Sequence, residues 1–192
     1  MQVAVFLDRD GTINEEMGYI NHLERFVLLP GTAAAIGRIN QSGLKAVVVT
    51  NQSGAARGYF PVEFIDQVHQ KMRGLLQEQG VYLDGIYTCV HAPSGEGEAG
   101  GCDCRKPKIG LMRQAAEELQ LDLNRSYVVG DRFKDVEMAR NGGAKAVLVL
   151  TGYGKGELEF LGSTSRVKPD FVAEDLSGAV DWILSDWKKS AP

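Results

Sequence analysis

Short apolar runs recur along the chain, separated by segments in which polar residues dominate. The runs are rich in Val and show little alternation with polar residues, which is typical of strands buried on both faces of a sheet. They predict strands at 3–7, 45–50, 85–90, 126–131 and 145–150, with a shorter strand at 170–173.

The segments between these runs place apolar residues three and four positions apart, the spacing of an amphipathic helix. The clearest helix begins at Pro61, a favourable first helical residue, and ends before Gly80. Further helices are predicted over about 108–121, 135–141 and 176–188, whereas 152–169 is predicted to be an irregular loop. Strands that alternate with helices predict an α/β fold, a parallel sheet with helices on both faces.

Length, composition and charge narrow the class of protein. The chain has 192 residues, which predicts one domain spanning 1–192, and 44% of them are hydrophobic, enough for a sizeable core. No apolar stretch reaches the ~18 residues of a membrane span, and a net charge of −4 offers no basic surface for nucleic acid. We therefore expect a cytoplasmic monomer that binds neither membranes nor nucleic acid.

Polar residues of a particular kind stand where the predicted strands end. Asp8 and Asp10 follow the first strand, Thr50 ends the second, and Asp131 ends the fourth, while Lys106 lies beyond the third. Ligands of such sheets bind beyond the carboxyl ends of the strands, so we expect these side chains to converge at one edge. Taken singly, each acid is equally consistent with a helix cap, and Thr50 with an ordinary strand residue.

The motifs DRDGT at 8–12, TNQSG at 50–54, RKP at 105–107 and GDRFKD at 130–135 occur in this order. Together they resemble the haloacid dehalogenase (HAD) superfamily of aspartate-nucleophile phosphotransferases. The resemblance covers nearly the whole chain and implies a Rossmann-like HAD fold. Large caps of that superfamily enter between the first three motifs, but the intervals 8–50 and 50–106 are filled by predicted helices, a strand and a loop. We therefore expect no large cap domain.

The resemblance implies a role for each acid. Asp8 would be the nucleophile and a Mg²⁺ ligand, and Asp10 the general acid/base, with its main-chain carbonyl on the metal. Asp131 would supply a second metal carboxylate. Asp135 would support the metal ligands without binding the metal, or would contact the metal through a water molecule. Lys106 would neutralise charge, because a carboxylate and a phosphate repel by ~4 kcal/mol per pair of unit charges at 4 Å and an effective dielectric near 20.

A second group of residues is expected to hold the phosphoryl oxygens. Thr50 would do so with its hydroxyl, and the next three residues with their main-chain amides. These residues are Asn51, Gln52 and Ser53. Hydrolysis through an aspartyl-phosphate would then divide one difficult step into two easier ones.

All three cysteines lie between 89 and 104. Cys89-x-His91 and Cys102-x-Cys104 offer four soft ligands in two pairs, the number that tetrahedral Zn²⁺ takes. An odd number of thiols argues against a disulfide framework, and three idle thiols beside a surface histidine are the alternative. A branch of capless HAD phosphatases carries a loop that ends in CDCRKP, as here, and this resemblance implies a structural zinc that stiffens the following RK pair.

Three arginines are expected near the mouth of the site: Arg57, Arg105 and Arg132. Spare guanidinium groups suit a second phosphate, which they grip with two parallel hydrogen bonds. FLDRDGTIN, NQSGAARG and the cysteine loop resemble branch members that remove the 7-phosphate of a heptose 1,7-bisphosphate. In those proteins the residues after the nucleophile contact the sugar; here they are Glu16, Met17, Gly18 and Tyr19. The loop between His91 and Cys102 is shorter than that resemblance leads us to expect.

Other functions remain open from the sequence. The same branch contains phosphatases of histidinol phosphate, and polynucleotide 3′-phosphatases also favour capless folds. A chain that only binds phosphorylated ligands is a further alternative, although intact Asp8 and Asp10 argue against it. The remaining histidines are expected to be structural or at the surface, with His69 on the solvated face of its helix and His22 in a loop.

Overall fold

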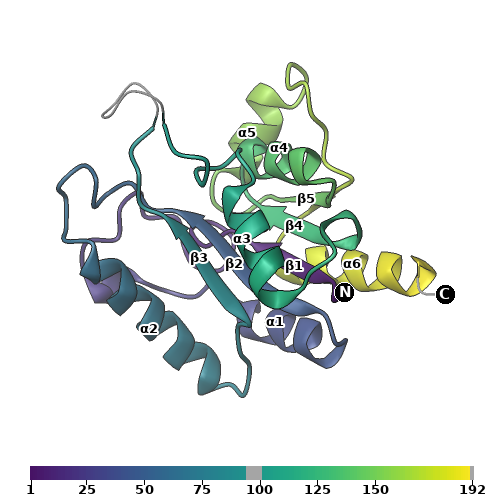
Figure 1. The fold of residues 1–192 in the computed structure, drawn as a ribbon, viewed down its shortest axis with the longest axis horizontal. Coiled ribbons are helices and arrows are strands. Elements are labelled where there is room, and N and C mark those ends of the chain that lie inside the picture. Colours follow the sequence, from purple (N-terminus) through teal and green to yellow (C-terminus); the bar gives the residue numbers. More distant parts are fainter. Residues whose placement is uncertain (94–100, 191–192) are drawn as a thin grey trace.

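The computed structural model describes residues 1–93 and 101–190. A single parallel sheet runs through its middle (Figure 1). Its six strands follow the order β3-β2-β1-β4-β5-β6. They are β1 Ala4–Leu7, β2 Lys45–Asn51, β3 Gly85–Cys89, β4 Tyr127–Gly130, β5 Lys145–Val149 and β6 Phe171–Ala173. Every strand predicted from an apolar run is present, with each end within one residue of the prediction, and the predicted α/β fold is confirmed.

Helices join the strands and cover both faces of the sheet (Figure 1). They are α1 Thr32–Gln41, α2 Glu63–Gln77, α3 Gly110–Leu119, α4 Phe133–Gly142, α5 Gly154–Leu161 and α6 Leu176–Ser190, with short 3₁₀ turns η1 Leu23–Arg25 and η2 Leu123–Arg125. Among the described residues, no helix is long and apolar enough to cross a bilayer.

The predicted irregular loop over 152–169 is wrong, because this segment contains α5. The three glycines at 152, 154 and 156 concealed the helix in the sequence, since glycine is a poor helix former. Gly154 is required by packing at the first turn: a Cβ there would lie 1.8 Å from the main-chain oxygen of Val149. The glycine therefore lets the start of α5 approach the end of β5.

The core lies on both faces of the sheet. In β1, Val5 and Leu7 point to the face covered by α1, α2 and α6, whereas Ala4 and Phe6 point to the face covered by α3 and α4. All four side chains are fully buried. Burying an aliphatic or aromatic side chain of this size contributes about 1.5–3 kcal/mol, which explains why the strand sequences are apolar without alternation.

The strand order reverses direction at β1, which has β2 on one side and β4 on the other. The connections leave to opposite faces there, so a crevice opens beyond the carboxyl ends of these strands. Asp8 follows β1, Thr50 lies at the end of β2, and Asp131 follows β4. The described chain forms only η1 and α1 between β1 and β2, and α2 between β2 and β3, so no cap domain occurs at these points in the described part.

Candidate active site

Lys106 lies at the centre of the site, with its side chain fully buried. Its Nζ is 2.7 Å from Oδ1 of Asp8 and 2.7 Å from Oδ1 of Asp135, and it donates to the carbonyl of Val49 at 3.1 Å. Burial by itself lowers the pKa of Lys106, but the carboxylates of Asp135 and Asp8 outweigh burial and raise it above its ordinary value. The amine is therefore held as a cation between two acids.

Three carboxylates surround this ammonium group. Potential ligand atoms of Asp8, Asp131 and Asp135 all lie within 4.8 Å of one another. Burial raises the pKa of Asp8, although the nearby Lys106 acts in the opposite direction. Burial and the neighbouring acids raise the pKa of Asp131 to about 8. Lys106 and the nearby Lys134 carry two positive charges against three carboxylates, so the cluster favours an additional cation.

The carboxylate of Asp131 bears on the identity of that cation. Its Oδ2 accepts a hydrogen bond of 2.8 Å from the main-chain N–H of Tyr153, whereas its buried Oδ1 has no hydrogen-bond partner among the described residues. A buried oxygen of this kind, beside two further carboxylates, fits a hard cation such as Mg²⁺, which takes oxygen ligands. Asp135, expected behind the ligands, brings its carboxylate into the cluster and also accepts from the N–H of Arg132 at 3.2 Å.

The side chain of Asp10 lies in a different network. It accepts hydrogen bonds from Arg9 at 2.8 Å, from Asn14 at 2.9 Å and from Gln52 at 2.7 Å. Burial by itself raises the pKa of Asp10, but the charge of Arg9 and the three donors outweigh it and lower the pKa. The carboxylate thus lies outside the three-acid cluster, as expected for a residue whose side chain does not bind the metal.

The residues at the end of β2 make hydrogen bonds to one another, to Lys106 and to β3. Thr50 is buried, and its hydroxyl accepts from Nε2 of Gln52 at 2.9 Å. The side chain of Asn51 pairs with both main-chain groups of Lys106, at 3.1 and 3.4 Å. The main-chain N–H of Gln52 donates to the carbonyl of Cys89 at 2.7 Å. The expectation that this amide binds a phosphoryl oxygen is therefore wrong, because it extends the sheet instead.

These side chains line a pocket of about 190 Å³. Most predicted site residues lie in its wall, together with Lys134 and Tyr153, which the sequence analysis did not single out. The lining residues are Asp8, Asp10, Glu16, Gly18, Tyr19, Thr50, Asn51, Ser53, Arg105, Lys106, Asp131, Arg132, Lys134 and Tyr153. Among the described residues, the predicted Met17, Gln52 and Arg57 are not part of this lining. Met17 packs against the core instead, and Gln52 acts through Asp10 and Thr50.

Arg132 is held at one side of the pocket by α5. Its Nε lies 3.0 Å from Oε1 of Glu157, and its guanidinium carbon lies 4.7 Å from the centre of the Tyr153 ring. The second oxygen of Glu157 accepts from the N–H of Phe133 at 2.7 Å, at the start of α4. The sequence pattern predicts a loop in this segment, and it therefore gives no sign that Tyr153 and Glu157 belong to the site.

The segment that follows the nucleophile contributes Glu16, Gly18 and Tyr19 to the pocket wall. Glu16 accepts from the N–H of Gly18 at 2.6 Å, and Tyr19 meets Tyr59 edge to face with ring centres 4.8 Å apart. Arg25 donates to the carbonyl oxygens of Tyr19 and Met17 at 3.2 and 3.1 Å. Arg25 thereby fixes the main chain of a segment that the sequence analysis assigned to the sugar.

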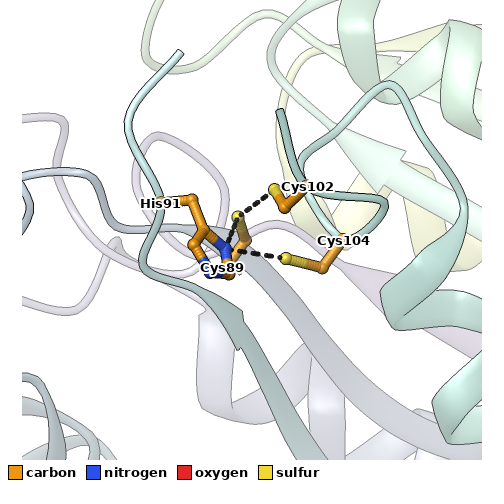
Figure 2. A group of neighbouring side chains, drawn as sticks. All are labelled: Cys89, His91, Cys102 and Cys104. Carbon is orange, nitrogen blue, oxygen red and sulfur yellow. Dashed lines mark hydrogen bonds between the residues drawn. The ribbon is translucent and has the colours of Figure 1, made fainter. Parts of the chain in front are cut away.

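The predicted zinc ligands come together at the end of β3 (Figure 2). Sγ of Cys89 lies 3.5 Å from Sγ of Cys102 and 3.6 Å from Nδ1 of His91, and that nitrogen lies 3.2 Å from Sγ of Cys104. Zn–S bonds of ~2.3 Å at tetrahedral angles place two sulfurs ~3.8 Å apart, close to these separations. The four donor atoms therefore fit Zn²⁺. The intervening residues 94–100, part of the loop expected to be ordered by zinc, lie outside the described residues.

The two remaining histidines differ in environment. His22 is exposed and accepts from the N–H of Glu24 at the start of η1, as expected for a loop residue. His69 is buried, at 8% exposure, so its predicted place on the solvated face of α2 is wrong. Its Nε2 lies 3.4 Å from Nη1 of Arg9. Since it lies one helical turn after the buried Ile65, the helical spacing could have placed it on the inner face.

A doubly wound parallel sheet with Asp8, Lys106 and Asp131 at its switch point is the arrangement of a HAD-like hydrolase, and residues 103–179 match the HAD-hydrolase-like family. The chain is 43% identical over 189 residues to the D-glycero-D-manno-heptose-1,7-bisphosphate 7-phosphatase of Thermosynechococcus vestitus, with 95% of each chain covered. It is 39% identical to the D-glycero-beta-D-manno-heptose-1,7-bisphosphate 7-phosphatase of Escherichia coli K12, covering 95% of this chain and 88% of that one. The chain therefore belongs to the heptose-1,7-bisphosphate 7-phosphatase family of HAD-like hydrolases.

The solved structures agree with this assignment. The D,D-heptose 1,7-bisphosphate phosphatase of B. bronchiseptica, solved in complex with magnesium and phosphate, superposes with a TM-score of 0.85 at 33% identity. The alignment covers 97% of this chain and 99% of that one. The resemblance drawn from the DRDGT, TNQSG, RKP and GDRFKD motifs is confirmed, and so is the Rossmann-like HAD fold.

Proposed function

We propose that the chain removes the 7-phosphate of D-glycero-D-manno-heptose 1,7-bisphosphate by way of a phosphorylated Asp8. The observation that carries the mechanism is the pairing of Asp8 with Lys106 at 2.7 Å, at the bottom of a pocket that opens at the strand ends. The family to which the chain belongs supports the substrate.

The nucleophile is Asp8, and its own contacts orient it. Its Oδ1 accepts from the N–H of Arg9 at 2.7 Å and pairs with Lys106, so the described contacts hold one oxygen and leave Oδ2 for attack on phosphorus. The negative charge of the bound phosphate opposes the effect of Arg9 and favours the protonated form of Asp10. Asp10 then gives this proton to the departing sugar oxygen and later takes one from the water that hydrolyses the aspartyl-phosphate. Thr50 and Ser53 lie in the same pocket wall and contact the phosphoryl oxygens.

A Mg²⁺ ion completes the proposal, with Asp8 and Asp131 as carboxylate ligands and the main-chain carbonyl of Asp10 as a further one. The cluster also brings in the carboxylate of Asp135, whose Oδ1 is paired with Lys106. Bound Mg²⁺ would offset the negative charge of nucleophile and phosphate and polarise the phosphoryl oxygens. The partnerless Oδ1 of Asp131 supports this ligand set.

Recognition of the distal 1-phosphate falls to two arginines at the pocket wall. Arg105 donates to the carbonyl of His91 at 3.1 Å, and Arg132 is held by Glu157. Both guanidinium groups line the pocket, so they can bind a phosphate that the nucleophile does not reach. Glu16 and Tyr19 line the same pocket and suit the sugar hydroxyls. Zn²⁺ on the four predicted ligands would serve as a structural cofactor, and we propose a monomer acting in the cytoplasm.

The experiment compares kcat/KM for heptose 1,7-bisphosphate, heptose 7-phosphate and histidinol phosphate in the presence of Mg²⁺. We expect the bisphosphate to be preferred, with heptose 1-phosphate as the product in ³¹P NMR. A charge-assisted hydrogen bond contributes ~1.5–3 kcal/mol, so the bisphosphate should exceed the 7-monophosphate roughly ten- to a hundredfold. Faster hydrolysis of histidinol phosphate would refute the proposed substrate.

A further inference from the structure

His69 is a buried histidine that the mechanism above does not use. It lies on α2, and its Nε2 is 3.4 Å from Nη1 of Arg9. A guanidinium group has only donors, so Nε2 must accept, and the ring is neutral with its proton on Nδ1. Burial and the charge of Arg9 lower the pKa of His69 to about 4, in agreement with a neutral ring. The histidine thus serves as a fixed acceptor for one side of Arg9.

The other side of Arg9 faces Asp10. Nη2 lies 2.8 Å from Oδ2 and 3.0 Å from Oδ1 of Asp10, and Nε lies 3.3 Å from the same Oδ1. Arg9 is only 2% exposed, and it is not among the residues that line the described pocket. Among the described residues, Asp10 is therefore the link between its guanidinium and the reacting groups.

These contacts form one continuous chain from α2 to the site. His69 holds Arg9, Arg9 holds Asp10, and Gln52 links Asp10 to Thr50 with hydrogen bonds of 2.7 and 2.9 Å. Rotation of the Asp10 carboxylate would break several of these bonds inside a buried region, which is costly. An exposed carboxylate without such partners would sample several rotamers.

We propose that Arg9 and His69 are positioning residues that hold the carboxyl group of Asp10 where it exchanges a proton with the leaving oxygen. This inference rests on the proposed function, in which the Asp8–phosphorus bond forms while the bond from phosphorus to the sugar oxygen breaks. The proton from Asp10 goes to that sugar oxygen. In the second step water gives its proton to Asp10 as its oxygen displaces Asp8 from phosphorus.

Two substrates with different leaving groups distinguish a role in positioning Asp10 from a general role in stability. A sugar oxygen leaves as a poor alkoxide and needs the proton, whereas p-nitrophenolate leaves without it. The value of kcat/KM covers the steps up to phosphorylation of Asp8. Loss of the positioning should therefore lower kcat/KM for the sugar phosphate and leave that for p-nitrophenyl phosphate nearly unchanged.

The test measures kcat/KM with Mg²⁺ for heptose 1,7-bisphosphate and for p-nitrophenyl phosphate, and follows the ratio of the two. His69→Leu removes the acceptor, and His69→Gln keeps an oxygen in reach of Arg9. Since misplacing a reacting group by about 1 Å costs up to ~100-fold, we expect the ratio to fall about 10- to 100-fold in His69→Leu. His69→Gln should restore most of the ratio, and His22→Leu, at an exposed histidine, should not change it.

Arg9→Lys provides a second variant in case His69→Leu does not fold. It keeps the buried charge but loses the paired contact with Asp10, so the same selective fall is expected. An equal loss on both esters, or an unchanged ratio in Arg9→Lys and His69→Leu, would overturn the inference. Turnover by the unmodified protein tests the proposed function separately, because only the ratio between variants reports on Arg9 and His69.

Discussion

Nη1 of Arg105 donates a hydrogen bond of 3.1 Å to the main-chain oxygen of His91, a residue of the four-ligand cluster. The arginine at the pocket wall is thereby connected to the segment that the proposed zinc would hold. The main chain between Cys104 and Lys106 completes the connection, since Lys106 is itself fixed by Asn51. We therefore expect that binding of zinc to the four-ligand cluster would also fix the position of Arg105 at the pocket wall.

Removal of one zinc ligand tests this coupling. Cys102→Ser should abolish the binding of one zinc per chain and lower Tm by about 4–8 °C, which corresponds to roughly 2 kcal/mol for a chain of this length. KM for the bisphosphate should rise, because Arg105 loses its fixed partner. Metal analysis, calorimetry and steady-state kinetics measure the three effects. Asp103→Asn, an exposed neighbour in the same turn, is the control, and an unchanged KM in zinc-free Cys102→Ser would contradict the coupling.

Glu157 should control the preference for a second phosphate through Arg132. Glu157→Ala removes the acceptor at 3.0 Å and leaves the guanidinium free to turn away from the pocket. A partly exposed ion pair contributes about 1 kcal/mol or less, so we expect the ratio of kcat/KM between bisphosphate and 7-monophosphate to fall about threefold to fivefold. Glu159→Ala, at an exposed position on the same helix, should have no effect. A ratio that is unchanged in Glu157→Ala would exclude this role.

The neutral state of His69 predicts a dependence of stability on pH. Burial, together with Arg9 and Arg73, lowers its pKa from 6.5 to about 4 in the folded chain, although Asp10 acts in the opposite direction. Because the unfolded chain binds the proton more tightly, this contribution is present above pH 6.5 and is lost as pH falls towards 4. The stabilisation lost over this range is roughly 3 kcal/mol. The free energy of unfolding of His69→Gln should therefore fall less than that of the unmodified protein, by this amount.

Urea unfolding at a series of pH values between 4 and 7 measures the difference. His22→Gln serves as the matched control, because that histidine is exposed. Parallel pH profiles for the unmodified protein and His69→Gln would show that His69 is not a buried neutral acceptor.

The sequence predicted the strands and the acids at their ends, because buried parallel strands have apolar runs and motif order fixes which residues follow them. It did not predict α5, since three glycines reduce helix propensity, and the close approach of Gly154 to Val149 is visible only in the folded chain. The contact of Glu157 with Arg132 was not predicted either, because Glu157 lies on that helix. The buried position of His69 was missed because a polar residue on an apolar face needs a partner, and Arg9 is sixty positions away.

The sequence also does not tell which of the acidic side chains come together in the folded chain. The motifs imply that Asp8 and Asp131 bind the metal with their carboxylates and Asp10 with its main-chain carbonyl, while Asp135 stays behind them. The structure brings the carboxylates of Asp8, Asp131 and Asp135 together, while that of Asp10 pairs with Arg9. Alternate residues of an extended segment point to opposite sides, but the turn after β1 does not follow that rule, so side-chain direction there depends on the folded chain.

Phosphorylation of Asp8 is the central claim, and acid quenching during turnover of p-nitrophenyl phosphate tests it most directly. In the Asp10→Asn variant the first step needs no proton donor, whereas hydrolysis of the aspartyl-phosphate lacks its base, so the intermediate should accumulate. Mass spectrometry should then find one phosphoryl group on the peptide that contains Asp8, and none in a variant that also carries Asp8→Asn. A phosphoryl group on another residue, or turnover that persists in Asp8→Asn, would contradict the account.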